Sequence, residues 1–133
     1  MAKPGSNIKD QLDRGYSEIL RISEIVSRGK ELNGRDIKTI GRVQLYDAMT
    51  SRATISCAED DPNSQLVVIT EFIEPLMSGS KATYQFIGEL EWQPQDSALA
   101  LKARTCRDVS KLDITRYYQG LDSMRKFLNS NAS

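Results

Sequence analysis

The stretch of this chain that decides its fold reads Tyr84-Gln85-Phe86-Ile87-Gly88-Glu89-Leu90-Glu91-Trp92. Apolar and polar residues alternate along it, as they do on a strand with one buried face, and a glycine interrupts the alternation. A second alternating strand follows at Leu99 to Arg104. A glycine in mid-strand marks a bulge or a sharp bend, by which a small sheet curls into a barrel. The stretch therefore predicts a curled five-stranded barrel.

Length and charge limit the classes of protein to which the chain can belong. Its 133 residues suit a single domain that buries a core without disulfides or metals. Its 18 Lys and Arg balance 18 Asp and Glu, so it lacks the broad positive field of a free-standing nucleic-acid-binding protein. The apolar run 66–69 is too short to cross a membrane, and residues 1–6 lack the apolar core of a secretory signal peptide. We expect a soluble intracellular protein that makes no membrane contact.

The cysteine and histidine content argues against metal centres and several kinds of catalysis. Cys57 and Cys106 lie in predicted strands away from any metal-ligand spacing, and the chain has no histidine, so we expect no structural zinc. Catalysis through a histidine base or a histidine-bound metal is also ruled out. Glu89 and Glu91 share a strand face, but no nucleophile or phosphate loop accompanies them. We expect no enzymatic activity and no cofactor.

Alternating patterns and turn signals predict the strands of the barrel. The predicted strands are Asp36 to Asp47, Arg52 to Ala58, Gln65 to Ile73, Ala82 to Gln93 and Ala98 to Asp108. In the first of them Ile37, Thr39, Val43 and Leu45 are expected to face the core, with Gly41 as a second bend. A further strand is predicted at Ser17 to Val26, although its apolar residues also fit a helical spacing.

Helical spacing replaces alternation after the last strand. Residues 110–128 carry one apolar stripe, and Ser110 with Asp113 resembles a capping box at its start. We therefore expect an extension at residues 1–16, one domain at 17–128 whose terminal helix spans about 111–128, and a frayed tail at 129–133. Five strands with glycine bends and a terminal helix favour an OB-fold barrel, an all-β fold, although a small β-sandwich fits much of the same pattern.

A set of short runs also resembles one known family. The runs are Gly41-Arg42-Val43-Gln44-Leu45-Tyr46-Asp47, Ser51-Arg52-Ala53-Thr54, Ile73-Glu74-Pro75, Gly79-Ser80, Tyr84-Gln85-Phe86-Ile87-Gly88-Glu89-Leu90 and Lys102-Ala103-Arg104-Thr105. In order and spacing they resemble the TEN-type smallest subunit of the CST telomere complex. Among its members, the plant-type sequences carry the most similar runs. The likeness covers residues 35–109 well and the terminal helix more loosely.

The resemblance implies a non-catalytic OB-fold subunit. In that family the small subunit pairs with the STN-type OB-fold subunit and, through it, with the CTC-type large subunit on single-stranded telomeric DNA. The complex acts at chromosome ends in the nucleus and recruits DNA polymerase alpha-primase for fill-in synthesis. The family's helix packs against a helix of its STN partner. That role carries over here to Ile114, Tyr117, Tyr118, Leu121, Met124, Arg125 and Leu128.

The helix stripe has an alternative interpretation, in which it packs on its own barrel. We expect Ile114 and Leu121 to face inward, and Tyr118, Arg125 and Leu128 to face the partner. The large aromatic side chains of the helix favour a partner surface, because such residues anchor protein interfaces.

Nucleic-acid contact is the second candidate role. An OB-fold offers a groove with cations and stacking aromatics, for which the candidates are Arg42, Tyr46, Arg52, Lys102 and Arg104, with Trp92 beside them. Few phosphates can be neutralised by a chain of zero net charge that also carries the acidic loop at 59–61. We therefore expect weak DNA binding by the chain alone. The alternative function is a stand-alone or replication-protein-A-like single-strand binder.

Overall fold

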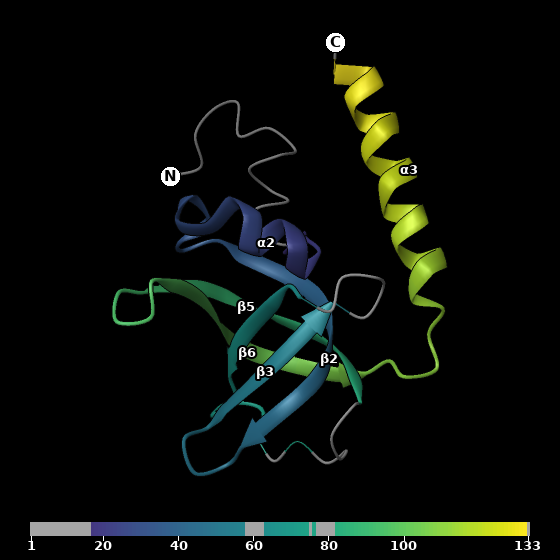
Figure 1. Ribbon diagram of the computed structural model, residues 1–133. Coiled ribbons are helices and arrows are strands. Elements are labelled where there is room, and N and C mark those ends of the chain that lie inside the picture. The colour runs from purple at the N-terminus through teal and green to yellow at the C-terminus, as the bar shows by residue number, and fades with distance from the viewer. Residues whose placement is uncertain (1–16, 58–62, 75, 77–81, 133) are drawn as a thin grey trace, which may run out of the picture.

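A closed five-stranded barrel forms the body of the protein in a computed structural model, which describes residues 17–57, 63–74, 76 and 82–132. Its strands are β2 (Asp36–Asp47), β3 (Arg52–Cys57), β4 (Gln65–Ile69), β5 (Thr83–Gln93) and β6 (Ala98–Asp108). They follow the order β2-β3-β4-β6-β5, and β5 pairs again with β2 (Figure 1). The β4–β6 pair is parallel and the other pairs are antiparallel. The predicted OB-fold barrel is confirmed.

Gly41 lies where β2 passes from one neighbour to the other. The first half of β2 pairs with β5 and the second half with β3, and the two ladders overlap at Gly41 and Arg42. A Cβ atom at Gly41 would lie 2.7 Å from Ile55 Cδ1 and 2.9 Å from Ile22 Cδ1. Glycine therefore lets the core side chains reach the backbone at the crossing point, as expected of a glycine inside a strand.

Gly88 has the same role in the β5–β6 pair. The register shifts between Ile87 and Gly88, which is the predicted bulge. A Cβ atom at Gly88 would overlap the Lys102 carbonyl oxygen and would lie 2.8 Å from Ala103 Cα. Since both neighbours are backbone atoms of β6, the two strands can approach this closely only when the residue is glycine.

A second bulge, in β2, corrects the predicted core face of that strand. The β2–β3 register shifts between Val43 and Leu45, which reverses the alternation of side chains beyond Val43. Leu45 is therefore 70% exposed, whereas Tyr46 packs against the core. The prediction that Leu45 faces the core was wrong because its alternation continued past the bulge.

The prediction of one strand over 17–26 was also wrong. Only β1 (Glu18–Ile19) is extended, and it pairs in parallel with the start of β2. The chain then forms the helix α2 (Ile22–Arg28) and the short 3₁₀ helix η1 (Gly29–Leu32). Ile22 and Ile25 are completely buried in the barrel core while Val26 is 48% exposed. The helical alternative was therefore right for Ile22, whereas Val26, which both spacings shared, lies at the surface.

β4 ends at Ile69, before the predicted end at Ile73. The chain turns after it, and the Ile73 amide donates a hydrogen bond to the Thr70 carbonyl oxygen over 2.9 Å. Phe72 is 65% exposed in this turn. The residues after Ile69 therefore form a turn and do not extend the strand. The predicted extension at 1–16, the acidic loop at 59–61, the connection at 77–80 and the last tail residue lie outside the described residues.

The C-terminal helix α3 (Ile114–Ala132) begins later than predicted and extends past the predicted end at Leu128. Its N-cap is Asp113, whose Oδ1 accepts a hydrogen bond from the Arg116 amide over 3.1 Å. Ser110 does not cap the helix, because its hydroxyl accepts a hydrogen bond from the Thr83 amide instead. Within the described residues, no helix is long and apolar enough to cross a membrane.

Candidate partner-binding surface

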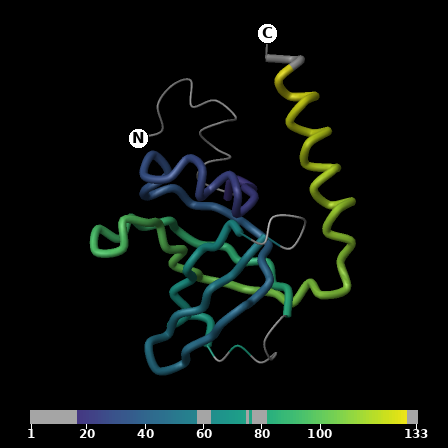
Figure 2. Tube along the Cα trace, in the orientation of Figure 1, coloured from purple at the N-terminus to yellow at the C-terminus, as the bar shows by residue number. Residues whose placement is uncertain are grey.

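Helix α3 stands beside the barrel and not across its end. Figure 1 shows α2 lying over the barrel, with α3 rising to one side of it. Figure 2 shows the last turns of α3 with no other described segment beside them. The barrel end is therefore closed by α2, and α3 does not serve as its plug.

The first half of α3 packs against the outside of the barrel. Tyr118 and Leu121 are 1% and 6% exposed and form a small cluster with Ile40 and Val109. The Tyr117 and Tyr118 rings meet nearly edge to face, with their centroids 5.3 Å apart. Burial raises the pKa of Tyr118 to about 12, so its hydroxyl stays neutral over the physiological range.

Two arginine pairs then hold α3 to the start of α2. The Arg21 guanidinium contacts both carboxylate oxygens of Asp122, at 2.8 and 3.0 Å, and lies 4.6 Å from the centroid of the Tyr118 ring. Arg125 donates to Glu24 Oε2 over 2.7 Å and to the Ile19 carbonyl oxygen over 2.6 Å. Each helix thus contributes one arginine and one carboxylate, which fixes the angle between them.

This arrangement lowers the pKa of the Glu24 carboxyl. Burial raises its pKa, but hydrogen bonds from the Arg125 side chain and the Arg21 amide, with the charges of both arginines, lower it further than burial raises it. The pKa of Glu24 therefore lies below its ordinary value. A carboxyl whose pKa is depressed on folding stabilises the protein above its unfolded pKa and loses that contribution as the pH falls through the folded pKa.

Replacing Glu24 with glutamine tests this assignment. At neutral pH we expect Glu24→Gln to lower the urea midpoint of unfolding, because Arg125 loses its ionic partner. The difference from the wild type should shrink as the pH falls below the ordinary pKa of a glutamate and through the lower pKa of Glu24 in the folded chain, where the native carboxyl becomes protonated as well. Glu71→Gln is the control, since the described residues offer Glu71 no ion pair. A difference that stays constant with pH contradicts the assignment.

From Met124 onward the helix presents exposed apolar side chains, which we call the distal face: Met124, Phe127 and Leu128. They are 47%, 65% and 55% exposed. At 100° per residue, Met124 and Leu128 share a flank with the half-buried Tyr117. Neighbouring exposed apolar side chains on an ordered helix are typical of a surface that a partner covers.

The structure divides the predicted helix residues into four groups. Tyr118 and Leu121 are buried, Ile114 and Tyr117 are half-buried against the same cluster, and Arg125 pairs with Glu24. Only Met124 and Leu128 of the predicted set belong to the distal face. We expected Tyr118 to face the partner, but its side chain is buried in the cluster between α3 and the barrel. Phe127 was left out of the predicted site because it lies off the main apolar stripe.

The predicted nucleic-acid residues come together only in part. Arg52 and Lys102 both align with Ile69, one on each side of β4, and Arg104 follows two residues along β6. They therefore share the outer face of the barrel. Arg42 pairs in register with Ser56 and Thr83, farther along the sheet. The Tyr46 hydroxyl donates a hydrogen bond to Glu74 Oε2 over 2.6 Å, so this hydroxyl already has a partner within the chain.

Carboxylates pair with two of these cations and lie opposite a third. Arg104 forms a two-pronged ion pair with Asp36, Lys102 faces Glu89 across the strands, and Arg52 lies 4.0 Å from Asp96. The outer face of β6 therefore lacks the excess of positive charge that a phosphate backbone requires. Trp92 lies apart from this group, near η1, where its amide donates to Asn33 Oδ1 over 2.8 Å.

Comparisons with known proteins agree with this geometry. A family model described as telomere-capping, CST complex subunit, matches residues 13–131. Human CST complex subunit TEN1 is 30% identical over 102 residues, covering 77% of this chain and 82% of that protein. The Arabidopsis thaliana protein of the same name is 33% identical over 102 residues, covering 74% and 77%. A chain in the crystal structure of the S. pombe Stn1-ten1 complex shares the fold, with a TM-score of 0.65 over 86% of this chain and 97% of that chain at 17% identity.

Proposed function

Since the chain belongs to the Ten1 family of telomere-capping CST complex subunits, we propose that it binds an STN-type OB-fold subunit through the distal face of α3. The observation that carries the proposal is the exposure of Met124, Phe127 and Leu128 in the last turns of α3, beside which Figure 2 shows no other described segment. An apolar helix face recognised by a second helix is a common mode of protein association.

The intramolecular contacts of α3 prepare this surface for binding. The buried Tyr118 and Leu121 and the two arginine pairs hold the helix at a defined angle before a partner arrives. Less ordering entropy is then lost on association, so more of the contact energy contributes to affinity. The partner binds only the folded chain, and each subunit therefore stabilises the other by mass action.

The remaining roles follow from assembly and need no catalytic group on this chain. The STN-type subunit links it to a CTC-type large subunit, and the assembly binds single-stranded telomeric DNA in the nucleus. The chain supports that binding and the fill-in synthesis by DNA polymerase alpha-primase as a structural subunit. Its paired cations, such as Arg104 with Asp36, support an indirect role in DNA binding.

Co-purification with an STN-type OB domain tests the proposal, with light scattering to count subunits. We expect a one-to-one complex, and weak binding of telomeric single strands by this chain alone at two salt concentrations. Failure to form the complex, together with tight and salt-sensitive DNA binding by the chain alone, would overturn the proposal in favour of a stand-alone single-strand binder.

A further inference from the structure

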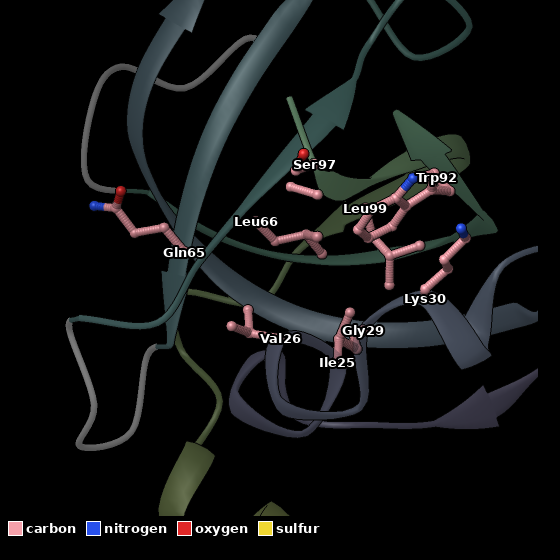
Figure 3. Close-up of a pocket in the computed structure, with 10 residues that line it drawn as sticks. Ile25, Val26, Gly29, Lys30, Gln65, Leu66, Trp92, Ser97 and Leu99 are labelled. Atoms are coloured by element: carbon pink, nitrogen blue, oxygen red, sulfur yellow. The ribbon is translucent and has the colours of Figure 1, made fainter. Parts of the chain in front are cut away.

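A pocket lies at the C-terminal end of α2, on the side of the barrel away from α3. Figure 3 shows it between α2 and the turn that joins β5 to β6. Ile25, Leu66 and Leu99 form its buried floor, and Val26 and Trp92 form part of its walls. Gly29 lies at its edge, where the lack of a side chain leaves the entrance open.

Hydrogen-bond donors surround this apolar floor. Lys30 Nζ lies 5.6 Å from the centroid of the Trp92 ring, close enough for a cation–π contact. Gln65 and Ser97 are the other polar lining residues. Within the part of the chain that the structure describes, Lys30 has no ion pair and the pocket lining has no carboxylate. The site therefore combines an apolar floor with one uncompensated positive charge.

The volume of the pocket limits its occupant. It measures about 260 Å³, below the roughly 300–1,000 Å³ of pockets that enclose whole drug-sized ligands. A space of this size suits one large apolar side chain with its neighbouring backbone. Anchor side chains in such pockets carry much of the energy of peptide and protein recognition.

The charge of the pocket indicates what flanks that side chain. A single ammonium group at the rim attracts one or two carboxylates. This electrostatic attraction is stronger where an apolar wall excludes water. Single-stranded nucleic acid instead requires a groove with several cations that follow its backbone. Among the described residues, Lys30 is the only cation in the lining, so the observations favour a peptide over an oligonucleotide.

We propose that this pocket binds an acidic peptide segment of a protein partner, with one apolar side chain on the Ile25–Leu66–Leu99 floor and an adjacent carboxylate on Lys30. This site goes beyond the α3 surface and shares no residue with it. α3 contacts the start of α2 through Arg21 and Glu24, whereas the pocket uses its end. Both surfaces can therefore be occupied at once.

Trp92 provides a direct measurement, because it is the only tryptophan in the chain. The probe is the blocked peptide acetyl-Asp-Glu-Phe-Asp-Glu-amide, titrated at low salt while the Trp92 emission is recorded. We expect a saturable spectral change with a dissociation constant on the order of 0.1–1 mM, reasonable for a short flexible ligand. Peptides with Ala in place of Phe, or with Asn and Gln in place of the acids, should bind at least about fivefold more weakly.

Two surface variants assign the contacts. Lys30→Glu and Val26→Asn should each weaken binding of the acidic peptide by about tenfold or more, through lost attraction in the first and a lost apolar wall in the second. Their controls are Lys111→Glu and Leu45→Asn, which make the same kinds of change at exposed positions outside the pocket. All four variants should still bind the STN-type domain, which separates this test from that of the α3 surface.

Three results would overturn the proposal. The first is no saturable Trp92 response to the acidic peptide up to several millimolar, and the second is equal binding by Lys30→Glu and Lys111→Glu. The third is saturable, salt-sensitive binding of oligothymidylate that Lys30→Glu abolishes, which would assign the pocket to nucleic acid.

Discussion

The double variant Met124→Glu with Leu128→Glu is expected to weaken binding to the STN-type OB domain by about 100-fold or more without unfolding the chain. Both side chains lie on the distal face and are about half exposed. In a complex they would be buried, and each glutamate would then place an uncompensated charge in an apolar contact. A loss of roughly 1.4 kcal/mol at each of the two positions, which is about tenfold per position, accounts for a 100-fold change in affinity.

The stability of this double variant should stay close to that of the wild type. Exposed substitutions away from packing contacts usually change the free energy of unfolding by no more than about 0.5 kcal/mol. The Tyr118 and Leu121 cluster and the arginine pairs remain intact beneath the substituted face. Substituting Tyr118 or Leu121 instead would not isolate the interface, because both residues hold the helix to the barrel.

A matched control is available on the opposite flank of α3. Thr115→Glu with Gln119→Glu adds the same charge at two exposed positions of the same helix, one turn apart as Met124 and Leu128 are. Both double variants are titrated against the STN-type domain by calorimetry, and the stability of each is measured by urea unfolding. The comparison separates the loss of apolar contact at the distal face from the general effect of two added charges. Near-native affinity of the Met124/Leu128 variant would place the interface elsewhere on the chain.

Gly88→Val should have the largest effect on stability, a loss of at least about 3 kcal/mol in the free energy of unfolding. The new side chain would meet the Lys102 carbonyl oxygen and Ala103 Cα, which are backbone atoms of the paired strand and cannot rotate away. Relief requires β5 and β6 to separate at the bulge, which breaks ladder hydrogen bonds in the barrel. Small domains are stable by only about 5–15 kcal/mol, so part of the population should be unfolded or insoluble.

Gly120→Ala is the control for this substitution. A Cβ atom at Gly120 has no neighbour within 4 Å, and the residue lies inside α3. Alanine there should stabilise the chain by roughly 0.5–1 kcal/mol because it restricts the unfolded chain and favours the helix. Urea midpoints that move in opposite directions for the two variants support the structural assignment. A Gly88→Val protein as stable as the wild type contradicts the close approach of β5 and β6.

Strand prediction succeeded where one face is buried over a long, regular ladder. The bounds of β2 and β6 match the predicted ones, and Tyr84, Phe86 and Leu90 point into the core as their alternation indicated. It failed at Leu45, where an extra residue in β2 reversed the faces. A bulge leaves no mark on an alternating pattern until the partner strand is placed beside it.

The terminal helix was predicted correctly, but the division of its faces between barrel and solvent was not. Periodicity shows that α3 has an apolar stripe, but it does not show how much of the stripe the barrel covers. That division depends on Arg21 and Glu24, about 100 positions away in the chain, which pair with Asp122 and Arg125. The pocket at Trp92 could not be predicted either, because α2 was interpreted as a strand.

The amino-acid sequence by itself determined the balance of charge, the set of barrel strands, the glycines at their close approaches and the amphipathic terminal helix. These features are local, since they depend on residue type and on spacings of two to four residues. Only the tertiary structure decided that α2 closes the barrel, that Tyr118 is core while Met124, Phe127 and Leu128 are surface, and that Lys30 meets Trp92. Each of these depends on which distant segments pack together, because burial is a property of the folded assembly and not of a residue's neighbours in sequence.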